Sequence, residues 1–324
     1  MTIPIGLLRG AITVSASIAF VLAWGSGFIA AKFATFDVSL WTVLFWRYLL
    51  LAVVLLAIAI PIGALRGLSR VDWRRLASVG AFSQLGYVVF VYASVAAGIS
   101  TGTTALIDAV QPLVVATLVG PVLGLRVRGA SWIGLALGAV GVALVVGSQL
   151  GGTAASPATY VLPILAMVCL IAATFLDRRL PTNRPILTTL TVHVTVVTVV
   201  LATIAAVTGN AAPPASSTFW VTTAFTALVP SLLAYALYWW LIRRIGVTSL
   251  NALLFAVAPT TAAAGAILFA EAITLFTALG FAISAVAVAV VLIAERRPDQ
   301  DERNGRKNSR MSVASSSGSS YAAK

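Results

Sequence analysis

The stretch ALIDAVQP at residues 105–112 returns as ALLFAVAP at residues 252–259, with the same residue at five of the eight positions. Both copies end in a proline that lies inside an apolar run. Beyond them, Gly134 matches Gly280 at nearly the same offset. The shared proline and the kept register predict an internal repeat.

Long apolar runs surround both copies. The chain of 324 residues is 60% hydrophobic and 9% charged, whereas a soluble domain is roughly one-quarter charged. A helix needs roughly 20 apolar residues to cross a bilayer, and barrel strands would alternate over roughly ten. The runs therefore predict an all-α membrane protein with about ten transmembrane helices. The predicted helices cover residues 12–31, 39–60, 76–97, 100–123, 130–149, 158–176, 186–208, 218–241, 248–269 and 272–294.

Basic residues predict the orientation, because cytoplasmic loops retain Lys and Arg. With the N-terminus inside, 19 of the 21 basic residues lie on the cytoplasmic side, and only Lys32 and Arg47 fall elsewhere. The first apolar run is too long for the apolar part of a signal peptide, so we expect it to remain as a helix. The sequence thus predicts a multi-pass protein of a bacterial inner membrane with both termini in the cytoplasm. Residues 295–324 are predicted to be a disordered cytoplasmic tail.

The repeat divides the predicted helices five and five. Residues 1–150 are expected to form the first five-helix repeat, and residues 151–294 the second. Because five is an odd number, the second repeat enters the membrane in the opposite orientation. Inverted repeats around a central cavity are typical of secondary transporters, which expose a site near the midplane to each side in turn.

Four short motifs resemble those of a known family. The first helix carries a Trp-Gly-x-x-Phe pattern at residues 24–28, and the second carries Phe-Trp-Arg-Tyr at residues 45–48. Pro112 and Pro259 close the repeated stretch, and residues 269–271 read Phe-Ala-Glu. Together they resemble the EamA-like members of the drug/metabolite transporter superfamily.

The resemblance extends over roughly residues 12–294. It implies a basket-like bundle of helices with a central cavity, and the export of amino acids or other small metabolites and drugs. One departure concerns the acid at Glu271, because the corresponding residues of the first half are Gly124, Leu125 and Arg126. The role of Glu271 is therefore expected to exist on one side only.

Asp108 is the first candidate for the site, because an ionisable group inside the membrane is costly and often functional. Thr101, Thr104, Asp108 and Gln111 recur at i, i+3, i+7 and i+10, which places them on one helix face. This polar stripe is predicted to line a wet cavity, where Asp108 hydrogen-bonds a substrate ammonium or hydroxyl group or carries a proton. The alternative is a structural acid that is hydrogen-bonded to neighbouring helices.

Polar and aromatic side chains on other helices complete the predicted substrate-binding set, because rings with a polar edge can enclose an apolar or cationic solute. These candidates are Trp24, Gln84, Tyr87, Tyr235, Tyr238 and Asn251. Asn251 has the alternative of joining helices. Trp239 is interpreted as part of the aromatic belt at the membrane surface, and His193 as a hydrogen-bonded core residue.

Two prolines and two charged residues are assigned to movement or structure. Pro112 and Pro259 each remove a helix hydrogen bond, which predicts hinges at equivalent depths. Arg47 is near enough to the outer surface to snorkel. It could bind a substrate carboxylate bidentately, but a gating or structural role is favoured, because its motif occurs in family members of different substrate class. Glu271 is expected to pair with Lys32 or Arg47, or to fix the helix turn.

The sequence lacks the residues that intramembrane enzymes need. With one His there is no HExxH zinc site, Asp108 has no acidic partner for an aspartyl protease, and no GxSxG-type turn comes with a base. A nucleotide-binding GxxxxGK[ST] loop is also missing. We therefore expect a transporter without cofactor or metal, whose partners are a small-molecule substrate and the lipid bilayer, and not nucleic acid. The alternative is a structural or signalling membrane protein that transports nothing, and the oligomeric state is open.

Overall fold

The computed structural model describes residues 5–124, 129–149, 155–180 and 184–296, and every regular element in these ranges is helical. In the first half the elements are α1 (Ile5–Ala34), α2 (Leu40–Ala59), α3 (Arg70–Gly80), η1 (Ala81–Gly86), α4 (Tyr87–Ala96), α5 (Thr101–Ala109), α6 (Gln111–Leu123) and α7 (Gly129–Gln149). In the second half they are η2 (Pro157–Tyr160), α8 (Val161–Arg179), α9 (Ile186–Val207), α10 (Ser217–Thr226), η3 (Ala227–Leu233), α11 (Ala234–Phe269) and α12 (Leu275–Arg296). All but two residues of the predicted tail lie outside the described residues.

Ten apolar crossings can be counted in the described part of the chain. Eight are long and apolar enough to span a membrane, and the two shorter apolar helices Trp132–Ser148 and Leu275–Val290 complete the number that the sequence predicts. Some crossings combine elements, as in α3, η1 and α4. Conversely, α11 contributes to two crossings, which separate at Gly246, where the backbone has the non-helical angles φ 79° and ψ 167° that glycine tolerates. The prediction of an all-α membrane fold is confirmed.

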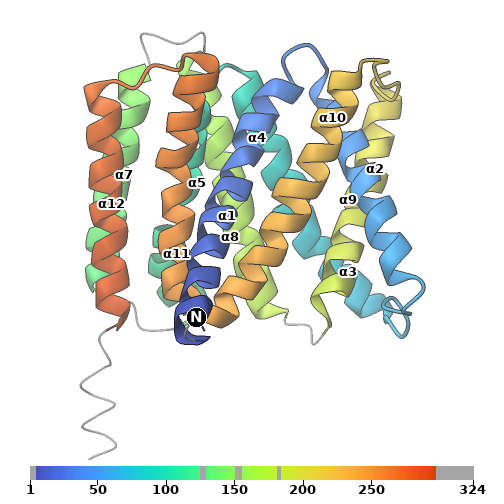
Figure 1. The fold of residues 1–324 in the computed structure, drawn as a ribbon, viewed down its shortest axis with the longest axis horizontal. Coiled ribbons are helices and arrows are strands. Elements are labelled where there is room, and N and C mark those ends of the chain that lie inside the picture. The colour runs from blue at the N-terminus through green and yellow to red at the C-terminus, as the bar shows by residue number, and fades with distance from the viewer. Residues whose placement is uncertain (1–4, 125–128, 150–154, 181–183, 297–324) are drawn as a thin grey trace, which may run out of the picture.

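The helices stand side by side, and α1 begins at the same end of the bundle at which α12 finishes (Figure 1). We name this end the Arg184 end, after the residue that precedes α9. The opposite end is named the Glu271 end, after the residue between α11 and α12. An even number of crossings returns the chain to the side on which it started, in agreement with ten.

Helices of the two halves interleave throughout the bundle. α1 and α5 contact α11, α2 contacts α9, α4 contacts α8, and α7 contacts α12. The main buried apolar cluster likewise combines Leu44 and Tyr92 of the first half with Leu201 and Val257 of the second. Large apolar side chains on the outside, such as Val14, are exposed, as a lipid-facing surface requires. The interior of the bundle is therefore enclosed by elements from both halves.

Small residues allow the halves to approach closely at two helix crossings. A Cβ atom added to Gly102 in α5 would lie 2.6 Å from the Cβ atom of Ala262 in α11. One added to Gly280 in α12 would lie 2.6 Å from the backbone oxygen of Gly141 in α7. Membrane helices favour small residues where their backbones meet. α5 and α11 are thus held directly against each other.

The third crossing of each half contains a π-helical turn, η1 in the first half and η3 in the second. Such turns are rare and frequently occur at functional sites. The offset of 147 residues that relates Ala105 to Ala252 also relates Gln84 in η1 to Ser231 in η3. Equivalent widened turns therefore carry polar side chains in both halves.

The two predicted hinge prolines differ in their backbone. α5 ends at Ala109 and α6 begins at Gln111, because the turn at Val110 tightens to hydrogen bonds from Val110 to Ile107 and from Leu113 to Val110, although the angles of Val110 stay right-handed helical. Pro112 fits the first turn of α6. α11 instead continues through Pro259 with helical backbone angles. The expected equivalent break is not found at Pro259, because a membrane helix can lose one hydrogen bond without leaving helical geometry. Hinge movement at either proline stays a prediction.

Candidate functional site

A cavity of about 430 Å³ lies between the two halves. Its lining includes Asp177 and Arg178, which are exposed at the Arg184 end, so the cavity opens there. Seven of the nine residues predicted to bind substrate line it, namely Trp24, Gln84, Tyr87, Asp108, Gln111, Tyr235 and Tyr238. Pro112 lines it as well. Both halves thus supply the walls of one space.

Asp108 faces this cavity beside Tyr87. The Tyr87 hydroxyl donates a hydrogen bond of 2.9 Å to Oδ2 of Asp108, whereas the buried Oδ1 has no partner in the described part of the chain. No ion pair of Asp108 occurs among the described residues. One carboxylate oxygen is therefore left for a solute, a proton or water.

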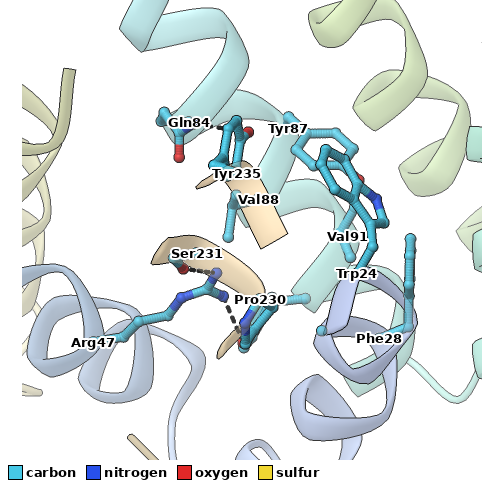
Figure 2. Close-up of a pocket in the computed structure, with 12 residues that line it drawn as sticks. Trp24, Phe28, Arg47, Gln84, Tyr87, Val88, Val91, Pro230, Ser231 and Tyr235 are labelled. Carbon is cyan, nitrogen blue, oxygen red and sulfur yellow. Dashed lines mark hydrogen bonds between the residues drawn. The ribbon is translucent and has the colours of Figure 1, made fainter. Parts of the chain in front are cut away.

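Aromatic rings form a wall on the side of α1 and α11. The ring centroids of Trp24 and Tyr235 lie 5.4 Å apart, and those of Trp24 and Tyr238 lie 6.1 Å apart. Gln84 fixes the position of Tyr235, because its amide donates a hydrogen bond of 2.9 Å to the Tyr235 hydroxyl (Figure 2). The Tyr48 hydroxyl in turn donates to Gln84, whose backbone oxygen lies at 2.9 Å and whose side-chain oxygen lies at 3.1 Å. A hydrogen-bonded chain thus connects the wall to α2.

A smaller pocket of about 50 Å³ continues from the cavity toward the Glu271 end. The two spaces share Trp24, Gln84, Tyr87 and Tyr235. Arg47 lines only the small pocket, where its guanidinium group donates to the Tyr92 hydroxyl at 2.6 Å and to Ser231 Oγ at 2.7 Å. Figure 2 shows this side chain reaching toward Ser231 and Pro230.

The position of Arg47 corrects one expectation. Its side chain was predicted to reach the outer surface, but the residue is only 6% exposed and points into the bundle. The physical reason is that the interior supplies two hydroxyl acceptors, which the apolar outside of the helix does not. Arg47 does not pair with Glu271.

Glu271 instead joins three helices at the Glu271 end. Its Oε1 lies 2.7 Å from the Lys32 ammonium nitrogen in α1. The backbone N–H of Thr101 donates to both carboxylate oxygens at 3.1 Å, and the Thr101 hydroxyl donates to Oε2 at 2.9 Å. Thr101 begins α5, so the carboxylate sits at the positive end of that helix. We name Lys32, Thr101 and Glu271 the Glu271 latch. Of the expected roles of Glu271, the pairing with Lys32 occurs in it.

Thr101 of the predicted polar stripe does not line the cavity, because it is buried and its hydroxyl binds Glu271. Two predicted substrate-binding residues are likewise not placed at the cavity. Thr104 is 1% exposed and absent from the lining, and its hydroxyl donates to the Ser100 carbonyl oxygen at 3.1 Å. The spacing predicted the helix face but not the depth: Thr104 lies one turn nearer the Glu271 end than Asp108, where α5 packs against α11. The side chain of Asn251 lies outside the described residues.

Further residues that were not predicted for the site line its two spaces, and three of them are informative. The interpretation of His193 as a hydrogen-bonded core residue is wrong for its Nε2 atom. His193 and Trp239 line the cavity, and the buried Nε2 of His193 has no described partner. Ser231 lines the small pocket, and its repeat relation to Gln84 was the available sequence signal. His193 and Trp239 lie in apolar stretches of the sequence, which gave no sign that their rings face a cavity. Within the described ranges, no three His, Cys, Asp or Glu side chains are grouped so as to hold a metal ion.

Comparison with known proteins adds two findings. The model of the EamA-like transporter family matches residues 11–147 and again residues 155–293. A solved structure titled "Crystal structure of protein" resembles this one with a TM-score of 0.63, covering 90% of this chain and 99% of that chain at 17% identity. No curated protein matches. At such identity the structural likeness shows the fold alone, whereas the family match covers each half separately.

Proposed function

Because the chain belongs to the EamA-like transporter family, we propose that it exports amino acids or other small metabolites or drugs by alternating access. As a family member it is a multi-pass membrane transporter. The direction, the substrate class and the mechanism are the parts that we add.

One observation carries the proposal: the cavity opens at the Arg184 end and is closed at the Glu271 end. The cavity is lined from both halves, and the Glu271 latch joins α1 and α5 to the turn between α11 and α12. A carrier in one state of an alternating-access cycle has this form, with its site exposed to one side only. Rocking of the halves against each other would expose the site at the other end.

The orientation follows from the basic residues. Arg178, Arg179 and Arg184 belong to the Arg184 end, so we place this end in the cytoplasm of a bacterial cell and both chain termini with it. The Glu271 end then faces outward. In this orientation the open cavity receives solutes from the cytoplasm, as export requires.

Counterflow in proteoliposomes tests the function. Vesicles with the purified protein are loaded with one unlabelled solute from a panel of amino acids and cationic drugs, and uptake of the labelled solute is followed. We expect saturable and stereoselective uptake for at least one solute above protein-free vesicles. A structural or signalling protein would show none with the whole panel, and that result would reject the proposal.

Asp108→Asn tests the polar side of the cavity. The change removes the charge while keeping the shape, so transport of an ammonium-bearing solute should require a roughly 10- to 100-fold higher concentration, since hydrogen bonds to charged groups contribute about 1.5–3 kcal/mol. Counterflow and uptake driven by a pH gradient are both measured. If uptake driven by the pH gradient is lost while counterflow is kept, Asp108 carries the transported proton.

Asp37→Asn is the matched control, because this carboxylate is exposed and does not line the cavity. It should leave both measurements close to those of the unchanged protein. If Asp108→Asn also leaves both unchanged, Asp108 is a structural acid.

A further inference from the structure

Arg47 carries a charge that the described protein does not neutralise. A guanidinium group has five N–H donors, and Arg47 donates to two neutral hydroxyl groups and lies over the rings of Tyr48 and Tyr92, so none of these partners carries a negative charge. Its buried Nε has no partner, and no carboxylate forms an ion pair with it in the described part of the chain. Buried charges are normally paired, so this site is one negative charge short.

The side chains around Arg47 add further donors. The Tyr92 hydroxyl accepts from Arg47, and the Tyr235 hydroxyl accepts from Gln84, which leaves the proton of each hydroxyl free to donate. The side-chain oxygen of Gln84 is an acceptor near the pocket, and the Tyr48 hydroxyl lies 3.1 Å from it and 2.9 Å from the Gln84 backbone oxygen. No Asp or Glu lines the small pocket. The pocket therefore offers hydrogen-bond donors and a positive charge, which is the chemistry of an anion site.

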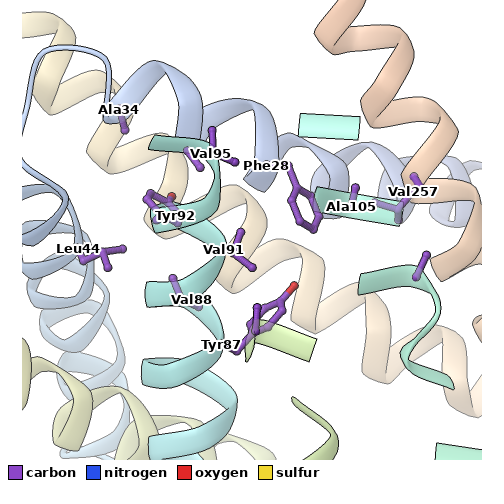
Figure 3. Packing of buried hydrophobic residues seen from close by; sticks show 14 of the residues in the cluster. Phe28, Ala34, Leu44, Tyr87, Val88, Val91, Tyr92, Val95, Ala105 and Val257 are labelled. Atoms are coloured by element: carbon purple, nitrogen blue, oxygen red, sulfur yellow. The ribbon is translucent and has the colours of Figure 1, made fainter. Parts of the chain in front are cut away.

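The apolar side chains around Arg47 strengthen the attraction of its charge for an anion. Phe28, Val88 and Val91 line the same pocket and are each at most 8% exposed (Figure 3). Apolar walls exclude water, and electrostatic attraction is stronger where water is excluded. A solute group that enters from the cavity passes the rings of Trp24 and Tyr235, which line both spaces.

The size and charge of the pocket select the kind of anion. A space of about 50 Å³ holds a group of a few atoms, while the larger cavity holds the rest of the solute. One guanidinium group balances one negative charge, and its planar N–H groups match the two oxygens of a carboxylate. A doubly charged phosphate would leave an unbalanced negative charge in an apolar pocket.

We propose that the small pocket beside Arg47 binds the carboxylate group of the transported solute. The assignment rests on the proposed transport function, because the solute must enter from the open cavity. It gives Arg47 a substrate role in place of the gating or structural role expected from the sequence. The carboxylate belongs either to an amino acid or to an organic monocarboxylic acid.

The first test uses the unchanged protein in detergent and compares solutes that differ at one group. Thermal unfolding is followed with L-leucine, L-leucinamide, 4-methylpentanoate and 3-methylbutylamine, and with the corresponding phenylalanine series. We expect the compounds with a carboxylate to raise the unfolding temperature more than the amides and amines. Stabilisation by 4-methylpentanoate as well as by leucine identifies a general monocarboxylate site, and stabilisation by leucine alone an amino acid site. The proposal is overturned if the carboxylates stabilise no more than the amides.

The second test changes the protein. Arg47→Gln should weaken carboxylate binding roughly 10- to 100-fold while leaving amide binding unchanged, because only the charged contact is lost. Arg47→Lys keeps the charge but loses the planar arrangement of donors. Its affinity for carboxylates should lie between that of the unchanged protein and that of Arg47→Gln. Arg66→Gln, which removes an exposed arginine, is the matched control and should change neither.

The ratio of carboxylate to amide binding separates a loss of carboxylate recognition from a folding defect. A folding defect would weaken the binding of carboxylates and amides alike. If Arg47→Gln does not fold, the proposal is tested by the carboxylate preference of Arg47→Lys and by the solute comparison on the unchanged protein. A variant that folds and keeps the full carboxylate preference contradicts the assignment. These readouts need no flux, so a negative counterflow result rejects the transport proposal and leaves carboxylate binding to be judged on its own.

Discussion

Cross-linking cysteines introduced by Phe33→Cys and Phe269→Cys is expected to reduce transport to the level of protein-free vesicles. The two rings lie 4.7 Å apart and join α1 to α11 beside the Glu271 latch. Alternating access requires the Glu271 end to open in every cycle, so a covalent bond there should hold the carrier in its present state. Counterflow is measured before oxidation, after oxidation and after addition of a reductant, which should restore it.

The design needs a background without other thiols. Cys169 is the only cysteine of the chain, and Cys169→Ala removes it. Each single cysteine variant serves as a control and should be insensitive to oxidation. Bifunctional thiol reagents of increasing length cross-link the same two cysteines at several distances, and counterflow is compared for each length. Undiminished counterflow in fully cross-linked protein, verified by mass spectrometry, would show that the halves do not separate at this end.

Glu271→Gln should shift the carrier toward opening at the Glu271 end. The side chains of Lys32 and Glu271 are 27% and 9% exposed, so the pair is largely shielded from water. Loss of a hydrogen-bonded charge costs about 1.5–3 kcal/mol, which corresponds to a shift of the equilibrium by roughly 10- to 150-fold. Alkylation of a cysteine introduced by Val91→Cys in the small pocket, with a membrane-impermeant reagent added from the outside, should accelerate accordingly.

Partner variants test whether the latch is the cause. Lys32→Gln should accelerate the alkylation similarly, and the double variant should not add the two effects, because both remove one interaction. The ion pair of Asp72 and Arg184, also 2.7 Å long, lies at the opposite end, so Asp72→Asn is the matched control. Equal alkylation rates in Glu271→Gln and the unchanged protein would leave the latch without a role in closure.

Much of the fold was predictable because the bilayer imposes it. Backbone groups in lipid must be satisfied within the segment, so a long apolar run forms a helix whatever its neighbours are. The repeated stretch at residues 105–112 and 252–259 then gave the division into halves, and the family match covers each half in turn. The exact boundaries of 1–150 and 151–294 stay a prediction, because residues 150–154 lie outside the described ranges.

The site was predictable only where a residue type alone is informative. Asp108 was found because a carboxylate is rare in an apolar run, and Glu271 because residues 269–271 resemble a motif of the family. The prediction for Thr104 was wrong because helical spacing gives the face of a residue but not its depth, and Thr104 lies one turn from Asp108 where α5 packs against α11. His193 was missed because the rotation of α9 about its axis depends on packing, as at Gly80, where an added Cβ atom would lie 3.0 Å from the His193 Cα.

The matching π turns also bear on how the two halves stay equivalent. A π turn takes up more residues than an α-helical turn, so it changes the direction in which the later side chains of its helix point. Here the two turns occupy equivalent crossings and keep Gln84 and Ser231 in register. Removal of the extra residue from one turn alone would rotate the rest of that crossing in one half only, and the two halves would no longer present equivalent faces to the cavity.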